Sequence, residues 1–152
     1  MAAPDERTLL VKRILQHAHQ VFGLPGAGST LAALKQRGFI LGIVTDTMYP
    51  LKWKMEWPAR VGVAEFIDVI ACSTDVRVHK PDPAIYQHAL TQARLTPAEA
   101  AFVGHDKREL DGAHSVGMLT VAVNYEPGTQ ADYCVQSLPD LLDLAIFQRE
   151  SQ

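Results

Sequence analysis

Cysteine is scarce in this sequence, which has only Cys72 and Cys134 among 152 residues. Two cysteines cannot form the dense disulfide framework of small secreted domains, so we expect a reducing, cytoplasmic environment. No segment approaches the ~20 apolar residues of a membrane-spanning helix, and the polar residues Met1–Arg7 lack the apolar core of a secretion signal. The sequence thus predicts a soluble protein that is neither exported nor inserted in a membrane.

Basic residues are also few. The chain has 14 basic and 17 acidic residues, a net charge of -3 and no basic block that could follow a nucleic-acid backbone. The glycine-rich loops of nucleotide-binding proteins, Gly-x-Gly-x-x-Gly and Gly-x-x-x-x-Gly-Lys-Ser/Thr, are absent from the sequence. Nucleic acid is therefore a poor candidate partner, and a nucleotide-binding domain is disfavoured.

Helical and strand-like segments alternate along the chain, and a hydrophobic content of 47% suffices for a single domain. The apolar run Phe39–Val44 is typical of a strand covered on both faces, as in a parallel sheet. We predict further strands over residues 66–72, 100–103 and 119–123, and helices over residues 5–22, 30–36, 50–61, 83–94, 109–116 and 138–148. The predicted fold is α/β: a Rossmann-like, doubly wound, mainly parallel sheet with helices on both faces and ligands beyond the carboxyl ends of its strands.

Two helix starts follow from local sequence. Ser29 or Thr30 is expected to cap the helix that ends at Gln36, because their side chains accept hydrogen bonds from the first free N–H groups of a helix. Pro83 is expected in the first turn of the helix that runs to Arg94. The residues of most interest for function then lie just after each strand.

The first strand end to examine is Thr45, directly after Val44. Its hydroxyl and the backbone N–H groups of the turn that begins at Asp46 could donate hydrogen bonds to a phosphoryl oxygen. A threonine after a strand is more often a helix cap. On its own, this position is a weak indication of a phosphate site.

The second candidate is Lys80, which lies in the segment His-Lys-Pro-Asp-Pro over residues 79–83. Two prolines stiffen the chain around a long cationic side chain. Such a lysine can neutralise the charge of a phosphate and of a nearby carboxylate. The alternative is a solvated loop lysine, but this segment before a helix is unusual enough to favour a functional role.

The third candidate is the segment Phe102–Ala113, a strand that runs into a glycine and then a cluster of acids. Carboxylates clustered at a strand end suit Mg²⁺, a hard cation that takes oxygen ligands and is often shared with a substrate phosphate. A structural interpretation stays open beside it, because Asp106 with Glu109 three residues later also fits a capping box.

Together these motifs resemble those of the haloacid dehalogenase superfamily, whose members are mostly Mg²⁺-dependent phosphatases. Thr45 after its apolar strand resembles the second motif of that family, Lys80 the third, and Gly104–Ala113 the acidic fourth. The likeness covers about residues 24–144. It implies a phosphate-binding site of Thr45, Asp46 and Lys80, a catalytic role for Thr45 and Lys80, and a small phosphorylated molecule as substrate.

The sequence departs from the family pattern in two motifs. The first motif, an apolar strand ending in Asp-x-Asp that supplies the nucleophile, is absent. In the fourth motif, His105 stands where the family usually has aspartate. Aligning the small pair after Asp111 with that of the family makes Asp106 and Glu109 the preferred metal ligands, with Asp111 as the alternative, and implies weakened Mg²⁺ binding.

The absent first strand has a structural consequence, because in the family it lies between the strands that end near Thr45 and Val103. Its absence leaves a central slot with two unpaired edges, and buried unpaired backbone groups are costly. The two flanking strands could pair directly, residues 8–15 could enter the slot, or another chain could add a strand. We prefer a homodimer, and keep a strand-donating partner as an alternative.

The resemblance also divides the chain. Residues 1–24 resemble the end of the family's helical cap, and residues 25–152 resemble its α/β core. The leading functional hypothesis is a shortened phosphatase-type hydrolase core that is weak or inactive alone. The alternative is a catalytically silent phosphate-binding or protein-assembly module on the same fold.

Two other groups of residues are interpreted as structural. Trp53 and Trp57 lie four residues apart on a predicted helix, which is the spacing of an ordinary packed stripe. Cys72 ends a predicted strand and has no obvious base after it, so a small core residue is favoured over a nucleophile.

Overall fold

The computed structural model describes residues 23–47 and 51–148, with only the backbone described over residues 51–55. Helices and strands alternate through these ranges, as predicted. In chain order they are α2 (Ala27–Gln36), β1 (Gly42–Thr45), α3 (Leu51–Arg60), β2 (Val69–Cys72), α4 (Ser73–Val76), α5 (Pro83–Ala93), β3 (Ala101–Gly104), α6 (Lys107–Ser115), β4 (Leu119–Val123) and β5 (Tyr133–Val135). Short 3-10 turns lie at Ala64–Phe66, Pro97–Glu99, Pro139–Asp143 and Ala145–Phe147.

Every strand pair in the described ranges is parallel. Strand β1 pairs with β2, with Gly42 opposite Val69. Strand β4 lies between β3 and β5, with Ala101 of β3 opposite Leu119. The described strands therefore form two groups, β1–β2 and β3–β4–β5. The α/β prediction is confirmed, and within the described residues no strand lies between β1 and β3, where the sequence predicted a missing one.

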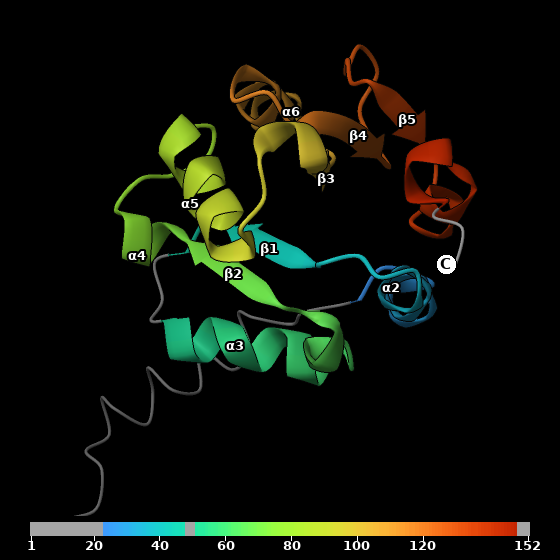
Figure 1. The fold of residues 1–152 in the computed structure, drawn as a ribbon, viewed down its shortest axis with the longest axis horizontal. Coiled ribbons are helices and arrows are strands. Elements are labelled where there is room, and N and C mark those ends of the chain that lie inside the picture. Colours follow the sequence, from blue (N-terminus) through green and yellow to red (C-terminus); the bar gives the residue numbers. More distant parts are fainter. Residues whose placement is uncertain (1–22, 48–50, 149–152) are drawn as a thin grey trace, which may run out of the picture.

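Helices cover both faces of the strands. Figure 1 shows α5 on one face of the β1–β2 pair and α3 across the other face. Strand β4 is buried on both faces, because Ala122 packs in one core while Val121 and Val123 pack in another. This alternation is the period of a strand. Central position and double cover make β4 the most buried strand that the structure describes.

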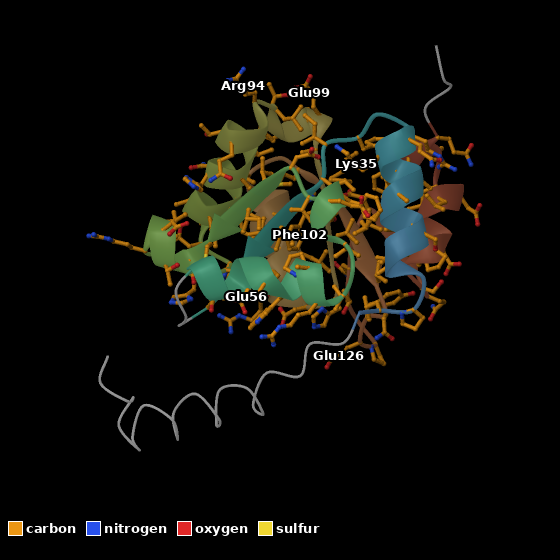
Figure 2. All side chains as sticks on the ribbon, turned by 90° about the horizontal axis from the view of Figure 1, so that it is seen from below. Lys35, Glu56, Arg94, Glu99, Phe102 and Glu126 are labelled. Carbon is orange, nitrogen blue, oxygen red and sulfur yellow. The ribbon has the colours of Figure 1, made fainter. Side chains whose placement is uncertain are left out.

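The core on the α5 side joins the two groups of strands. Its buried members are Ala71, Ile85, Tyr86, Leu90, Phe102, Leu110, Ala113, Met118 and Ala122, and Val44 of β1 packs against them. Phe102 lies in the interior of the molecule in Figure 2, whereas Arg94 and Glu99 lie at its periphery. This core therefore packs α5 and α6 against strands of both groups, β1 and β2 in one and β3 and β4 in the other.

Strand β1 differs from its prediction. The apolar run Phe39–Val44 indicated a strand buried on both faces, but β1 begins only at Gly42 and none of its residues is buried. Ile40 just before it is 47% exposed. The reason is that β1 pairs on one side alone among the described residues, so its second edge and part of its surface lack cover.

Three further predictions need correction. The helix over residues 138–148 is wrong: Leu144 is extended between two short turns, and the guanidinium of Arg37 donates hydrogen bonds to the carbonyls of Leu142 and Phe147, both 3.0 Å long. Strand β5 was not foreseen. Helix α2 is capped at Gly26 and not at Ser29 or Thr30, because Gly26 takes a left-handed conformation with φ 77°.

Other predictions hold or fall outside the described residues. Pro83 begins α5, and α3 agrees with the predicted helix over residues 50–61. Cys72 is fully buried, as expected of a core residue, while Cys134 is exposed. The predicted helix over residues 5–22 and the side chain of Trp53 lie outside the described part. Across the described ranges, no helix is both long and apolar enough to cross a membrane.

Candidate functional site

The site begins with the loop that carries Lys80. The Asp82 N–H donates to the carbonyl of His79 at 2.9 Å, and the Asp82 carboxylate accepts from the Ala84 N–H at 2.9 Å. The first bond closes a turn around Lys80, and the second caps α5. The Lys80–Pro81 peptide bond is cis. The two hydrogen bonds of Asp82 hold the Lys80 backbone in position relative to α5.

The side chain of Lys80 turns inward and meets α6. Its Nζ lies 2.8 Å from Oε1 of Glu109, and the two side chains are only 12% and 25% exposed. This separation is that of a charge-assisted hydrogen bond. The interpretation of Lys80 as a solvated loop lysine is therefore wrong, because the structure pairs it with one of the predicted acids.

Asp46 joins this pair from the end of β1. Its Oδ1 accepts a hydrogen bond from the backbone N–H of Lys80 at 3.1 Å and lies 3.6 Å from Nδ1 of His79. Three segments that are distant in sequence therefore meet at one place, beyond the carboxyl ends of β1 and β3. This is where ligands bind in doubly wound sheets.

Thr45 is adjacent to this group through its neighbour Asp46. The turn after it is held from β2, because the Ser73 hydroxyl accepts from the Thr47 N–H at 2.9 Å and donates to the Thr47 carbonyl at 3.2 Å. Sequence reasoning missed Ser73, although its position directly after β2 and beside β1 was the available signal. Thr45 also lines an apolar cavity of about 180 Å³ with Ile43, Trp57, Pro58, Val61, Val63 and Ile70.

The acids Asp106, Glu109 and Asp111 each contact a different partner. Asp106 caps α6, because its Oδ1 accepts from the N–H groups of Arg108 and Glu109 at 2.8 and 3.2 Å. The side chain of Glu109 pairs with Lys80 in place of closing the capping box. Asp111 lies on the exposed side of α6, where its Oδ2 pairs with Nζ of Lys107 at 2.5 Å.

These partners bear on the expected magnesium site. Within residues 23–47 and 51–148, no group of three or more His, Cys, Asp or Glu side chains could hold a metal ion. Asp106 is engaged with backbone N–H groups, Glu109 with a lysine, and Asp111 with another lysine. The described donors thus do not form a complete Mg²⁺ site, which needs oxygen ligands in near-octahedral arrangement.

A close approach of backbone holds α6 against the Lys80 loop. A Cβ atom added to Gly112 would lie 2.7 Å from the carbonyl oxygen of Pro81 and 3.0 Å from its Cα. Both are backbone atoms and cannot move aside easily. Gly112 is therefore required here for its lack of a side chain. Its close approach to Pro81 determines where Glu109, on the same helix, lies relative to the Lys80 loop.

Tyr86 contributes a second tie between the helices, which sequence reasoning also missed. It is fully buried, and its hydroxyl donates a 2.8 Å hydrogen bond to the backbone carbonyl of Glu109. Burial raises the pKa of the Tyr86 phenol, and the charges of Glu109, Asp46 and Asp106 raise it further. The phenol therefore stays protonated and remains a hydrogen-bond donor.

Comparison with known proteins matches most of the chain to one family. The sequence profile of the haloacid dehalogenase-like hydrolases matches residues 5–123. The chain is 32% identical to (S)-2-haloacid dehalogenase 1 of a Pseudomonas strain, over 78% of the chain and 52% of that protein. It is 36% identical to a glyceraldehyde 3-phosphate phosphatase of Pyrococcus furiosus, over 84% of the chain and 55% of that protein. The chain spans about half the length of these relatives.

Solved structures show the same similarity in three dimensions. A phosphatase from Thermococcus onnurineus superimposes with a TM-score of 0.73 at 32% identity, covering 89% of this chain and 62% of that one. A dehalogenase structure superimposes with a TM-score of 0.77 at 26% identity, covering 91% of this chain and 63% of that one. Both phosphatases and dehalogenases are thus among its structural relatives.

Proposed function

The chain belongs to the haloacid dehalogenase-like hydrolase family, and from this premise we propose that it is the phosphate-holding part of a phosphatase-type hydrolase. The observation that carries the proposal is the meeting of Lys80, Asp46 and Glu109 at the carboxyl ends of the strands. The proposed substrate is a small phosphorylated molecule.

In this proposal Thr45 and Lys80 hold the phosphoryl oxygens. The Lys80 ammonium offsets negative charge, and that stabilisation grows as a transition state gains charge. The Thr45 hydroxyl and the backbone N–H groups from Asp46 onward donate hydrogen bonds to the remaining oxygens. The Asp46 carboxylate acts through the backbone, since it orients the loop that presents Lys80.

We further propose that the chain alone is weak or inactive as an enzyme. A strand ending in Asp-x-Asp, which supplies the nucleophile in the family resemblance, is absent from the sequence. The residues described at the site hold charge and donate hydrogen bonds, but none is placed as an attacking group. We therefore expect binding of the phosphoryl group without efficient turnover.

Magnesium binding is proposed to be weak. Phosphatases of the family generally use Mg²⁺. To bind the ion here, the Glu109 carboxylate would have to give up its contact with the Lys80 ammonium. The Asp106 carboxylate would have to bind the ion while it still accepts hydrogen bonds from two backbone N–H groups. Desolvating Mg²⁺ for one or two engaged carboxylates gains little free energy. No chemical step of the proposal depends on the ion.

The gap between β1 and β3 supports a partner strand. Each of these strands is paired on one side among the described residues, and Val44 and Phe102 contact the same core. An exposed strand edge can be completed by another chain. We propose a homodimer, with a strand-donating partner as the alternative. We also propose that residues 1–24 are the end of a helical cap and that residues 25–152 are the α/β core.

The open edges also favour a second candidate function. A catalytically silent assembly module would use the same fold and the same edges but would not need a phosphate site. A turnover assay with an aryl phosphate and Mg²⁺ tests the shared expectation of little activity. Efficient phosphate release that Lys80→Met abolishes would contradict both candidates, because it would require a nucleophile elsewhere in the chain.

A further inference from the structure

Tyr86 occupies a position between the two halves of the proposed site. Its ring packs edge-on against Phe102, with centroids 5.3 Å apart and an interplanar angle of 86°. Its hydroxyl crosses to α6 and binds the carbonyl of Glu109. Glu109 is the residue whose carboxylate pairs with Lys80. The Tyr86 phenol thus contacts the backbone of Glu109, and the side chain of Glu109 pairs with Lys80.

We propose that Tyr86 is a positioning residue of the Lys80 site, whose hydroxyl fixes the first turn of α6 to α5 and so sets the separation of Lys80 and Glu109. This inference rests on the proposed function, because that function is what gives the Lys80 site its role in holding phosphate. It is tested by the coupling between two side chains, which does not require enzymatic activity.

Several contacts hold α6 in place. Leu110 and Ala113 of α6 pack in the core on the α5 side, and Gly112 approaches the Pro81 backbone. The Tyr86 hydrogen bond adds a polar contact almost one turn before Gly112, at Glu109, the residue whose side chain pairs with Lys80. The packing of Phe102 holds the ring, because a buried tyrosine between well-packed neighbours has few rotamers.

The charge around the phenol agrees with this role. Asp46, Glu109 and Asp106 all act on the Tyr86 hydroxyl, and each raises its pKa. The hydroxyl therefore lies within electrostatic reach of the three acids that border the proposed site. A merely apolar side chain would fill the same core volume, so the hydroxyl is the part with a positional task.

The test is a double-mutant cycle measured in two backgrounds. The coupling between Lys80→Met and Glu109→Gln is obtained from unfolding equilibrium constants of the full chain, first with Tyr86 and then with Tyr86→Phe. We expect the coupling factor to fall by about threefold or more with Tyr86→Phe, because the pair loses its fixed separation. Tyr125→Phe is the matched control, since the Tyr125 hydroxyl bonds Gln136 and should leave the coupling unchanged.

Each outcome is decisive. A coupling that Tyr86→Phe leaves unchanged overturns the positioning role, even where stability falls, because a packing role alone lowers stability. A coupling absent already with Tyr86 contradicts the ion pair and therefore the proposed function as well. For the case in which Tyr86→Phe does not fold, NMR of the native chain should show a slowly exchanging Tyr86 hydroxyl proton near the Glu109 backbone, and its absence overturns the inference.

Discussion

The backbone amide of Lys80 donates a hydrogen bond to the carboxylate of Asp46, 34 positions earlier in the chain. This bond joins the turn after β1 to the loop before α5, and the Lys80 side chain extends the connection to α6 through Glu109. Two contacts of one residue, one from its backbone and one from its side chain, thus assemble three separate segments. The proposed phosphate site depends on this assembly.

Gly112→Ala should destabilise the fold. The added methyl group would lie 2.7 Å from the Pro81 carbonyl oxygen, within a packed contact of two backbones. Overpacking of this kind costs about 1–3 kcal/mol, so we expect the free energy of unfolding in urea to fall by about 2 kcal/mol.

Gly28→Ala is the control for that experiment. Gly28 also lies in a helix, but a Cβ added there would meet nothing within 4 Å. Alanine at an unstrained helical position should raise stability by about 0.5–1 kcal/mol. Equal effects of the two substitutions would show that the contact between α6 and the Lys80 loop is looser than described.

Acid should weaken the contact between β4 and the segment before β5. The Thr120 N–H and hydroxyl both donate to Asp132, at 2.8 and 2.9 Å, and lower its pKa from 3.8. A carboxyl group whose pKa is lower in the folded than in the unfolded state stabilises the fold fully at pH values above its unfolded pKa. That contribution is lost as the pH falls through its folded pKa.

Thr120→Val removes one of the two donors and tests this pH dependence. We expect the loss of unfolding free energy between about pH 5 and about pH 2 to be smaller in Thr120→Val than in the parent chain. Thr91→Val is the control, since its hydroxyl bonds a carbonyl in its own helix. The same acid profile in parent and Thr120→Val would refute a contribution of the Thr120 hydroxyl to the lowered pKa of Asp132, since the backbone N–H of residue 120 remains as a donor in both proteins.

The sequence predicted the order of helices and strands because apolar runs and helix starts are local signals. It also located Lys80 and Glu109, but not their direct contact, since that contact depends on how α6 packs on the Pro81 backbone. The C-terminal helix was wrong because Arg37, far away in the chain, binds the Leu142 carbonyl, which a helix would use itself, and also the Phe147 carbonyl. Tyr86 was missed because a buried tyrosine in a helix is ordinary until its hydroxyl partner is known.

The gap between β1 and β3 predicts a dependence of oligomeric state on β1. Sedimentation equilibrium of the full chain should show a dimer if a second copy completes the edge. Ile43→Lys should weaken association, because it puts a charge on a half-buried apolar strand. Arg94→Glu, which lies at the C-terminal end of α5 at the periphery of the molecule, should leave it unchanged. A strictly monomeric parent chain would contradict the homodimer proposal.

Mg²⁺ binding should be weak and should involve both site acids. In calorimetry with Mg²⁺ and inorganic phosphate together, Asp106→Asn/Glu109→Gln should bind less than the parent chain, because the substitutions remove two anionic oxygen donors. Asp111→Asn is the control, since its carboxylate faces Lys107 on the exposed side of α6. A larger loss with Asp111→Asn would make Asp111 the ligand in place of Glu109.

The most direct test of the account is calorimetric titration of the full chain with inorganic phosphate, compared with Lys80→Met and Lys107→Met. Lys80 is 12% exposed and faces the site, whereas Lys107 is 56% exposed and pairs with Asp111 on the surface. We predict that Lys80→Met weakens phosphate binding about tenfold or more, equivalent to about 1.4 kcal/mol, and that Lys107→Met leaves it unchanged. Equal binding by all three proteins, or no binding by the parent chain, would contradict a phosphate site at Lys80.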